Sequence, residues 1–474
     1  MGKGNFIGIN FGTTNTAVFH LQSTDDGYGK AALGEGGGNV PFSSIVAIPK
    51  NGGPLEFGRS VKRRQEEFAQ NYEIFTSMKS YLGTDKEFVV GSEKYTATDI
   101  TAEFLKYVKE HILQFHEIDI TEAGVAFPIG FSLEARLALR SAVERAGITI
   151  KSFVPESTAA YFANREITRG YSRVMVLDWG GGTFDISILN QEKNTVKEIA
   201  VFGEKIGGDD IDMEIAGYVH TEIVKKSGLN IPFDSMKPTE RDHIMDICES
   251  AKIAISLTGE EYGINVSNYG EYGSKHVTIN VELLNSLVEP IIESKVLRAI
   301  DTALERAGLT PSGIDSVIIV GGSSNLSAYE TAISNLFGAD KFVLPQKPQW
   351  STAEGAALMQ IIRGSFKLKD TIGIELSDGS IFPVFKANED GVGSKIKSIV
   401  FSLVEETQNA NFIFTNGGQI EERITVPTKG FIDEQIRLDA EIGEDQIAVI
   451  TIYNPYTNTT HKVEMNKLTF HYDI

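Results

Sequence analysis

Three clusters of glycine each follow a short apolar run with the composition of a β-strand. They are Gly12, Gly180–Gly182 and Gly321–Gly322. Because glycine has no Cβ atom, the backbone amides of such loops can approach an anion closely. One such cluster alone is more often a simple turn, but three of them in one chain indicate a phosphate-binding site.

Hydroxyl and carboxylate groups stand beside these glycines. Thr13, Thr14 and Thr183 supply hydroxyl donors, and Asp178 and Asp185 are carboxylates of the kind that hold a hydrated Mg²⁺. The chain contains no G-x-x-x-x-G-K-[ST] segment, which excludes a P-loop. The glycine clusters therefore have to bind phosphate in another arrangement.

The strand–turn–strand pattern at the first glycine cluster occurs a second time. Residues 7–13 and 175–183 both run from an apolar strand through a polar residue to glycine and threonine, with Asn10 and Asp178 at matching offsets. This similarity predicts an internal duplication. Two facing hairpins of this kind could hold the phosphates of a nucleotide from both sides.

The elements that must position these residues alternate between strands and helices as far as Gly364. Helical periodicity is present at 60–82, 100–115, 133–146, 208–226, 240–256 and 282–307. Alternation of strand and helix predicts an α/β fold. From about Asp370 onward, short alternating runs replace the helical pattern, with a turn signal at Asn416-Gly417. We therefore expect a separate β domain at the C-terminal end.

Composition restricts the partners and the compartment. Of 474 residues, 64 are acidic and 44 are basic, which gives a formal net charge of −20. This balance disfavours nucleic acid and anionic membrane as partners, and the basic run 62–64 is interpreted as the solvated face of a helix. No apolar stretch approaches the roughly 20 residues of a spanning helix. Cys248 is the single cysteine, so no intrachain disulfide can form and a reducing, cytoplasmic compartment is expected.

Six segments, spread in order along the chain, resemble those of one protein family. They are residues 7–15, 155–160, 177–185, 203–212, 248–252 and 319–324, which read IGINFGTTN, PESTAA, LDWGGGTFD, GEKIGGDDID, CESAK and IVGGSS. The sequence resembles the Hsp70 chaperones, whose ATPase domain belongs to the actin and hexokinase superfamily. The resemblance covers essentially the whole chain. It implies a two-lobed, actin-like ATPase domain of α/β fold with duplicated strand–turn–strand phosphate loops, followed by a small all-β sandwich.

The resemblance also implies the roles of single residues in a site for ATP or ADP with Mg²⁺. Lys79 would position the attacking water, with Glu156 nearby, and Asp178 and Asn10 would hold Mg²⁺ through water. Without the resemblance, Lys79 would be an exposed helix lysine and Glu156 an acid at a helix N-terminus. The residues implied to be catalytic are Lys79, Glu156, Asp178, Thr183, Asp185 and Asn10. Those implied to bind nucleotide are Gly12, Thr13, Thr14, Gly180, Gly181, Gly182, Gly207, Gly208, Asp209, Glu249, Lys252, Ser256, Gly321, Gly322 and Ser323.

Several positions of the site depart from the family pattern. Asn10 stands where the family has aspartate, which removes a negative charge from the metal shell and a proton acceptor; such losses cost about 10²–10⁴ in rate. Ile253 and Asn325 replace the two arginines that flank the base, and Gln349 replaces an aspartate near it. Loss of cation–π stacking weakens nucleotide affinity. The sequence thus predicts an ATPase that binds Mg-nucleotide and hydrolyses it slowly.

The segment after the ATPase domain departs from the pattern as well. Residues 366–370, which read FKLKD, stand where the family has an acidic, leucine-rich linker. Ser152 stands where the family has an arginine that couples the domains and receives J-domain proteins. We therefore do not expect coupling by the usual route.

The resemblance implies a division into domains and a set of partners. We expect a nucleotide-binding domain at 1–364, a linker at 365–370 and a substrate-binding-like β-sandwich at 371–474. The chain ends at Ile474, about where the family's sandwich ends, so a helical lid is not expected. The expected partners are an unfolded polypeptide or peptide segment, a J-domain co-chaperone and a nucleotide exchange factor, with no nucleic acid and no membrane.

Two other functions remain open at this stage. One is a regulatory or scaffold relative that binds ATP as a structural ligand without hydrolysing it, which Asn10, Ile253, Asn325 and the unusual linker favour. The other is a small-molecule kinase of the same superfamily. The near-complete hydrolytic set argues against the first, and the β domain and the segment around Glu156 argue against the second.

Overall fold

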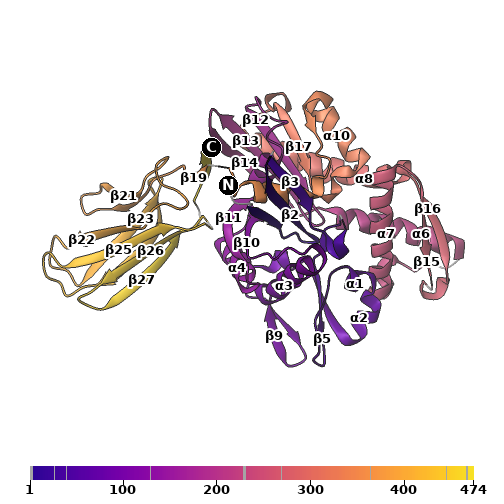
Figure 1. Cartoon of the computed structure of the whole chain (residues 1–474), viewed down its shortest axis with the longest axis horizontal. Coiled ribbons are helices and arrows are strands. Elements are labelled where there is room, and N and C mark those ends of the chain that lie inside the picture. The colour runs from indigo at the N-terminus through magenta and orange to yellow at the C-terminus, as the bar shows by residue number, and fades with distance from the viewer. Residues whose placement is uncertain are drawn as a thin grey trace. The chain divides into compact units, whose positions relative to one another are not determined.

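The computed structural model describes residues 4–25, 27–38, 40–128, 130–227, 231–267, 269–362, 364–444, 446–465 and 468–473. The chain forms two compact units, which Figure 1 traces from indigo to yellow. The first contains Met1–Leu189 and Ile199–Ile361, and the second contains Asn190–Glu198 and Ile362–Ile474. Residues 1 and 474, the outer limits of the predicted domains, lie outside the described residues.

The first lobe of the first unit is built on a sheet with the strand order β11-β10-β1-β2-β3. β1 pairs with β2 in antiparallel fashion and with β10 in parallel fashion. The strands are β1 (Asn5–Asn10), β2 (Asn15–Thr24), β3 (Gly27–Ala32), β10 (Glu122–Phe127) and β11 (Thr149–Pro155). Asn10 is the last residue of β1 and lies opposite Ala126 of β10, so it stands at the edge of the sheet where the first glycine loop begins.

The second lobe repeats this arrangement. Its sheet has the strand order β18-β17-β12-β13-β14, with β12 and β17 parallel. The strands are β12 (Arg173–Trp179), β13 (Phe184–Glu192), β14 (Thr195–Glu204), β17 (Ser316–Val320) and β18 (Phe342–Val343). Asp178 lies opposite Val320 of β17, at the position that Asn10 occupies in the first sheet. The predicted internal duplication is therefore confirmed by the order of the strands.

Helices and short strands surround the two sheets. The helices are α1 (Gly58–Arg63), α2 (Gln65–Asn71), α3 (Ala97–His116), α4 (Leu133–Arg145), α5 (Glu156–Ala163), α6 (Gly208–Ser227), α7 (Pro238–Thr258), α8 (Val281–Ile291), α9 (Leu297–Ala307), α10 (Ser327–Phe337) and α11 (Ser351–Leu358). The remaining strands of this unit are β4 (Phe42–Ser43), β5 (Ile45–Pro49), β6 (Glu56–Phe57), β7 (Tyr72–Thr76), β8 (Glu87–Val90), β9 (Glu93–Thr96), β15 (Tyr262–Val266) and β16 (Lys275–Ile279). α11 packs against α5, β1 and β2, and each sheet has its own large apolar core.

The helix predicted over 60–82 is wrong in its second half. Helices α1 and α2 end at Asn71, residues 72–76 form the strand β7, and Met78–Tyr81 form a single 3₁₀ turn. The segment Tyr-Glu-Ile-Phe-Thr is rich in residues that favour strands, and β7 pairs along its length with β5. Apolar spacing in so short a run does not distinguish a helix from a strand.

The longest predicted helix, 282–307, is confirmed but is not uniform. It consists of α8, a π-helical turn at Ile292–Val296 and α9, with Pro290 inside α8. Because proline has no N–H and its ring crowds the preceding turn, it interrupts the α-helical hydrogen bonds at this point.

The second unit is a β-sandwich of two four-stranded sheets. Their strand orders are β21-β20-β23-β24 and β22-β25-β26-β27. Along β25 the side chains alternate between exposed and buried, which is the expected pattern for one face on a core. The strands are β20 (Ile372–Glu375), β21 (Ile381–Phe385), β22 (Lys397–Ser402), β23 (Asn409–Asn416), β24 (Gln419–Pro427), β25 (Gln435–Ile442), β26 (Ala448–Asn454) and β27 (Thr459–Met465).

The predicted linker is part of a strand in this unit. β19 (Ser365–Leu368) pairs with the C-terminal strand β28 (Phe470–Asp473), and β28 also pairs with Thr195–Lys197 of β14. The side chain of Lys369 donates a hydrogen bond to the carbonyl oxygen of Glu198 at 2.7 Å. The unusual lysine-containing linker is thus fixed by backbone pairing to the C-terminal strand.

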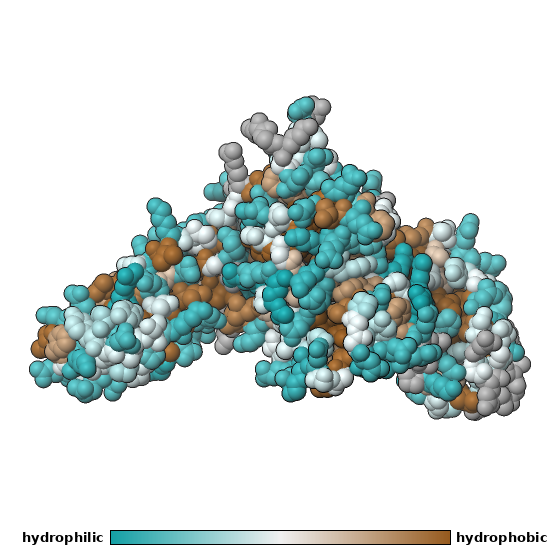
Figure 2. Space-filling model, turned by 60° about the horizontal axis from the view of Figure 1, so that its bottom comes forward, coloured by the Kyte–Doolittle hydropathy of each residue, from teal (hydrophilic) through white to brown (hydrophobic). Residues whose placement is uncertain are grey.

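The surface in the view of Figure 2 is mainly hydrophilic, with hydrophobic residues in smaller groups. Within the part of the chain that the structure describes, no helix is both long and apolar enough to cross a membrane.

Two helical glycines provide a test of the packing between α11 and α5. A Cβ atom on Gly355 of α11 would lie 1.8 Å from the carbonyl oxygen of Ala159, whereas one on Gly217 of α6 would meet nothing within 4 Å. We expect Gly355→Ala to destabilise the first unit by at least about 1–3 kcal/mol through overpacking. Gly217→Ala should stabilise it by about 0.5–1 kcal/mol, because alanine favours helices. Thermal unfolding of both variants measures this, and equal effects would contradict the close helix packing.

Candidate functional site

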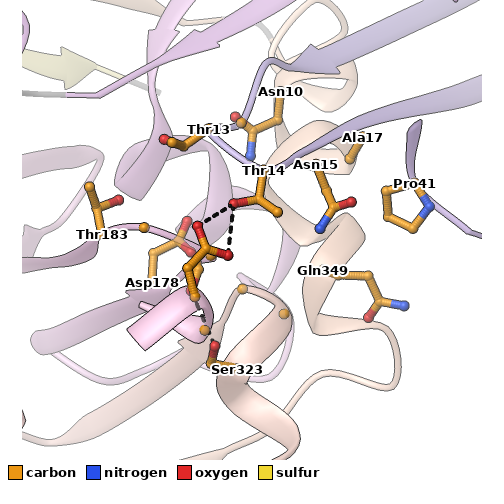
Figure 3. A pocket seen from close by; sticks show the side chains of 18 of the residues that line it. Asn10, Thr13, Thr14, Asn15, Ala17, Pro41, Asp178, Thr183, Ser323 and Gln349 are labelled. Carbon is orange, nitrogen blue, oxygen red and sulfur yellow. Dashed lines mark hydrogen bonds between the residues drawn. The ribbon is translucent and has the colours of Figure 1, made fainter. Parts of the chain in front are cut away.

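A pocket of about 150 Å³ lies where the loops after β1, β12 and β17 meet. In Figure 3, Thr13 and Thr183 lie toward one end of the pocket, and Pro41 and Gln349 lie toward the other. The lining residues are Asn10, Gly12, Thr13, Thr14, Asn15, Ala17, Pro41, Lys79, Glu156, Asp178, Gly180, Gly181, Gly182, Thr183, Asp185, Gly208, Asp209, Glu249, Lys252, Ile253, Gly321, Gly322, Ser323 and Gln349.

The glycines let the loop after β1 and the loop after β12 approach each other without side chains between them. A Cβ atom on Gly181 would lie 2.1 Å from the hydroxyl oxygen of Thr14, and one on Gly12 would lie 2.0 Å from the carbonyl oxygen of Asn15. Gly321 adopts a φ of 92°, which side chains disfavour. The loops of both lobes therefore expose backbone to one small space.

Hydrogen bonds connect these loops to one another. The amides of Gly208 and Asp209, at the start of α6, donate to the carbonyl oxygens of Gly180 and Gly181 at 3.0 and 2.8 Å. The Thr14 hydroxyl donates to the Asp209 carboxylate at 3.2 and 3.4 Å, which the dashed lines in Figure 3 mark. Asp209 belongs to the second lobe and Thr14 to the first, so this contact crosses the cleft between the lobes.

An ion pair lies beside the two loops. The Lys79 ammonium is 2.7 Å from a carboxylate oxygen of Glu156, and the two side chains are only 10% and 9% exposed. Lys79 lies in the 3₁₀ turn after β7, and Glu156 begins α5 directly after β11. Removing one partner of a pair this deep would leave an uncompensated charge. Lys79 is therefore not the exposed helix lysine that its sequence context alone suggested.

Two carboxylates of the second lobe have strongly raised pKa values. Burial raises the pKa of Asp178 to about 7, with further contributions from the charges of Glu156 and Asp185, while Lys79 acts in the opposite direction. Burial and Glu156 raise the pKa of Asp185 to about 6, again opposed by Lys79. Such values are typical of groups that bind a cation or exchange a proton near neutral pH.

The residues suit a hydrated Mg²⁺. The side-chain oxygen of Asn10 is buried and has no hydrogen-bond partner among the described residues, so it can accept from a water molecule. Asp178 lines the same pocket and accepts one long hydrogen bond, 3.4 Å, from the Thr352 hydroxyl. Mg²⁺ prefers one or two carboxylates and keeps several waters. Within the described ranges, no three His, Cys, Asp or Glu residues converge as direct metal ligands.

Almost all residues predicted for the site line this pocket. The two exceptions are Gly207 and Ser256. A Cβ atom on Gly207 would lie 2.1 Å from the carbonyl oxygen of Gly181, so this glycine permits close packing behind the loop. Ser256 lines a neighbouring cavity, and its hydroxyl donates to the carbonyl oxygen of Lys252 at 2.7 Å.

The comparison with protein families agrees with the fold and with this arrangement of loops. A family model described as "Hsp70 protein" matches residues 56–425, which is most of the chain. The chain belongs to the Hsp70 family. Membership in the Hsp70 family supports a chaperone-like function with ATP binding, and the two-lobed α/β unit followed by a β-sandwich is the architecture that this family predicts.

The basic run 62–64 has a different role from the one that the sequence indicated. Lys62 forms an ion pair with Glu249, and their side chains are 19% and 16% exposed. Lys62 belongs to α1 in the first lobe and Glu249 to α7 in the second. The interpretation of the run as a solvated helix face is therefore wrong for Lys62, which connects the two lobes of this Hsp70 relative across the cleft.

Sequence reasoning missed several residues that line the site. Asn15, Ala17 and Pro41 line the pocket, and Thr352 contacts Asp178 from α11. Asn15 lies within the resembling segment 7–15 and could have been chosen from it. Thr352 is 174 positions from Asp178 in the chain, so only the folded structure reveals its contact.

The raised pKa of Asp178 predicts a pH-dependent effect on stability. A carboxyl group whose pKa rises from its ordinary value of 3.8 to about 7 on folding costs stability as pH rises from about 4 to 7, and the whole cost is present above pH 7. We expect Asp178→Asn to raise the unfolding temperature of the ligand-free chain at pH 8 and to change it much less at pH 5.

Thermal unfolding at the two pH values measures this difference. Asp301→Asn, on the exposed part of α9, is the matched control. A gain for Asp178→Asn that is equal at pH 5 and pH 8 would show that the ionised form of Asp178 carries no folding cost.

Proposed function

We propose that this Hsp70-family protein binds ATP with Mg²⁺ in the pocket between its two lobes and hydrolyses the nucleotide slowly. The observation that carries the proposal is the buried Lys79–Glu156 pair at 2.7 Å, which lines the same pocket as the glycine loops, Asp178 and Asp185. Phosphoryl transfer depends mainly on positioning and charge stabilisation, and this pocket supplies both.

The loops from the two lobes would hold the phosphates. The backbone amides near Gly12 and Gly181 can approach phosphate oxygens because no Cβ atom intervenes, and Thr13, Thr14 and Thr183 add hydroxyl donors at the same pocket. When bound, Mg²⁺ would neutralise charge on the phosphates, with Asp178 and Asn10 holding its hydration shell.

The remaining polar groups would act on the attacking water. Lys79, fixed by Glu156, would orient a water molecule toward the terminal phosphate. Asp185, with a pKa of about 6, would accept a proton near neutral pH. Asn10 cannot accept a proton as an aspartate could, so the pocket has one acid–base group fewer than the family pattern and hydrolysis should be slow.

A regulatory function without hydrolysis is the second candidate. It is favoured by the same neutral Asn10, whose buried oxygen is without a hydrogen-bond partner in the described part of the chain. ATP would then act as a ligand that holds the lobes together. No observation favours a small-molecule kinase.

Single-turnover hydrolysis of ATP distinguishes these functions. We expect slow hydrolysis by the unaltered chain, a rate at least about tenfold higher in Asn10→Asp, and a loss of about 10²-fold or more in Lys79→Ala and Glu156→Gln. Equilibrium binding of ATP should change far less. Lys30→Ala is the matched control, because Lys30 makes a 2.7 Å ion pair with Glu354 but is 54% exposed.

Two results would contradict parts of this account. No hydrolysis in the unaltered chain or in Asn10→Asp, with ATP still bound, would favour the regulatory function. Loss of hydrolysis in Lys30→Ala equal to that in Lys79→Ala would remove the argument from the buried pair.

For the second unit, we propose binding of an extended segment of another polypeptide. Among the described strands, β22 is an edge strand whose one partner is β25. Val400 on β22 is 56% exposed, and Val404 just after it is 75% exposed. An edge with free backbone groups and outward aliphatic side chains can accept an added strand. This would be the peptide or unfolded polypeptide expected for a chaperone.

Anisotropy of a fluorescein-labelled, aliphatic seven-residue peptide tests the β22 edge. We expect Val400→Glu combined with Val404→Glu to weaken peptide binding at least about tenfold, because both apolar contacts are lost. Thr460→Glu, on the edge strand β27 of the same sheet, is the control. Equal weakening by both variants would contradict binding at β22.

A further inference from the structure

A second cavity, of about 280 Å³, adjoins the pocket that the glycine loops form. The two share Asn15, Pro41, Lys252 and Ser323 among their lining residues, so a molecule with its phosphates in the first would extend into the second. The inference below rests on the proposed function, that is, on a nucleotide bound by the glycine loops.

One wall of this cavity is aliphatic. Ile253 and Leu257 of α7 line it, and they are 48% and 67% exposed. Residues four apart lie on the same face of a helix, so the two side chains form one apolar surface. Apolar side chains this exposed beside a cavity are suited to contact an apolar ligand.

A second part of the cavity wall carries guanidinium groups. Arg59 and Arg63 of α1 line the same cavity and are also four residues apart. α1 packs directly against α7. Among the described residues, neither guanidinium has a hydrogen bond or an ion pair, whereas the neighbouring Arg64 is paired with Glu67. Asp246 and Glu249 also line the cavity, but Glu249 is paired with Lys62.

The two walls together suit a flat heteroaromatic ring. A guanidinium plane stacks on such a ring through cation–π and planar contacts, and an aliphatic surface makes apolar contact with a ring face. The polar side chains of Asn325, Gln349 and Ser256 line the same cavity and can form hydrogen bonds with polar atoms at the edge of the ring. Both lobes are needed to form this cavity, because α1 belongs to the first lobe and α7 to the second.

We propose that Arg59 and Arg63 recognise the purine base of the nucleotide from the first lobe, against the aliphatic wall of Ile253 and Leu257. These arginines thus determine base affinity in a site whose second lobe offers isoleucine and asparagine at 253 and 325. Because the base contacts both lobes, it contributes to holding the cleft closed, in addition to the phosphates.

Calorimetric titration with Mg-ATP and with Mg-tripolyphosphate tests the proposal on the full chain. The variant is Arg59→Gln combined with Arg63→Gln, and the control is Arg64→Gln, which removes an equivalent exposed charge outside the cavity. We expect the double variant to lose about 5- to 30-fold in affinity for ATP. Its affinity for tripolyphosphate, which has no base, should stay within about twofold of the unaltered chain.

The outcomes separate this proposal from the proposed function. If the unaltered chain binds no ATP, the proposed function fails and this proposal fails with it. If the chain binds ATP and the double variant binds it as tightly as Arg64→Gln does, this proposal alone is wrong. Equal losses for ATP and tripolyphosphate would also overturn it, because the arginines would then act on phosphate charge and not on the base.

Discussion

The structure depends on an imbalance of charge buried between the two lobes. Asp178, Asp185 and Glu156 come together around Lys79, and Asp212 lies deeper against Lys252 at 2.9 Å. Burial raises the pKa of Asp178 and Asp212 to about 7 even with a lysine nearby. The carboxylates of this region are therefore incompletely neutralised by the protein itself, and a bound cation would relieve that cost. In the proposed function, Mg²⁺ accompanies ATP and offsets the negative charge of these acids.

The duplicated sheets make this arrangement possible. A central strand of each lobe carries a polar residue at its C-terminal end, Asn10 as the last residue of β1 and Asp178 as the residue before the last of β12, and each strand continues into a glycine loop. Because the loops lack Cβ atoms where they meet, backbone from both lobes reaches one space. Two contacts then connect the lobes across the cleft. The first joins Thr14 and Asp209 beside the glycine loops, and the second joins Lys62 and Glu249 beside the neighbouring cavity. Under the proposed function, nucleotide binding and closure of the cleft would be parts of one equilibrium.

The glycine loops, with their threonines and with Asp178 and Asp185, could be predicted from the residues, because strand-loop patterns and glycines are local signals. Lys79 and Glu156 were implied only by the resemblance to the Hsp70 family, because their own sequence context indicates a helix lysine and an acid at a helix N-terminus. The helices α3 and α7 follow from periodicity over ten or more residues. The duplication follows from the repeated strand–turn–strand segment, and the β domain follows from a succession of short alternating runs. The strand β7 could not be distinguished from a helix, because five residues carry too little pattern.

The positions of Lys62, Arg59 and Arg63 at the cleft could not be predicted for another reason. In the sequence they are part of a basic stretch, and only the packing of α1 against α7 brings them to the cleft. The sequence indicated that Ile253 and Asn325 replace two arginines of the family, but it did not indicate which other side chains could contact the base.

A crystal structure of the chain with Mg²⁺ and a non-hydrolysable ATP analogue tests the central claim most directly. The account predicts the phosphates between the loops at 12–14 and 180–182, the metal's waters against Asp178 and Asn10, and the base between α1 and α7. A nucleotide bound elsewhere on the chain, or phosphates that contact only one of the two loops, would contradict the claim that the duplicated hairpins together form the nucleotide site.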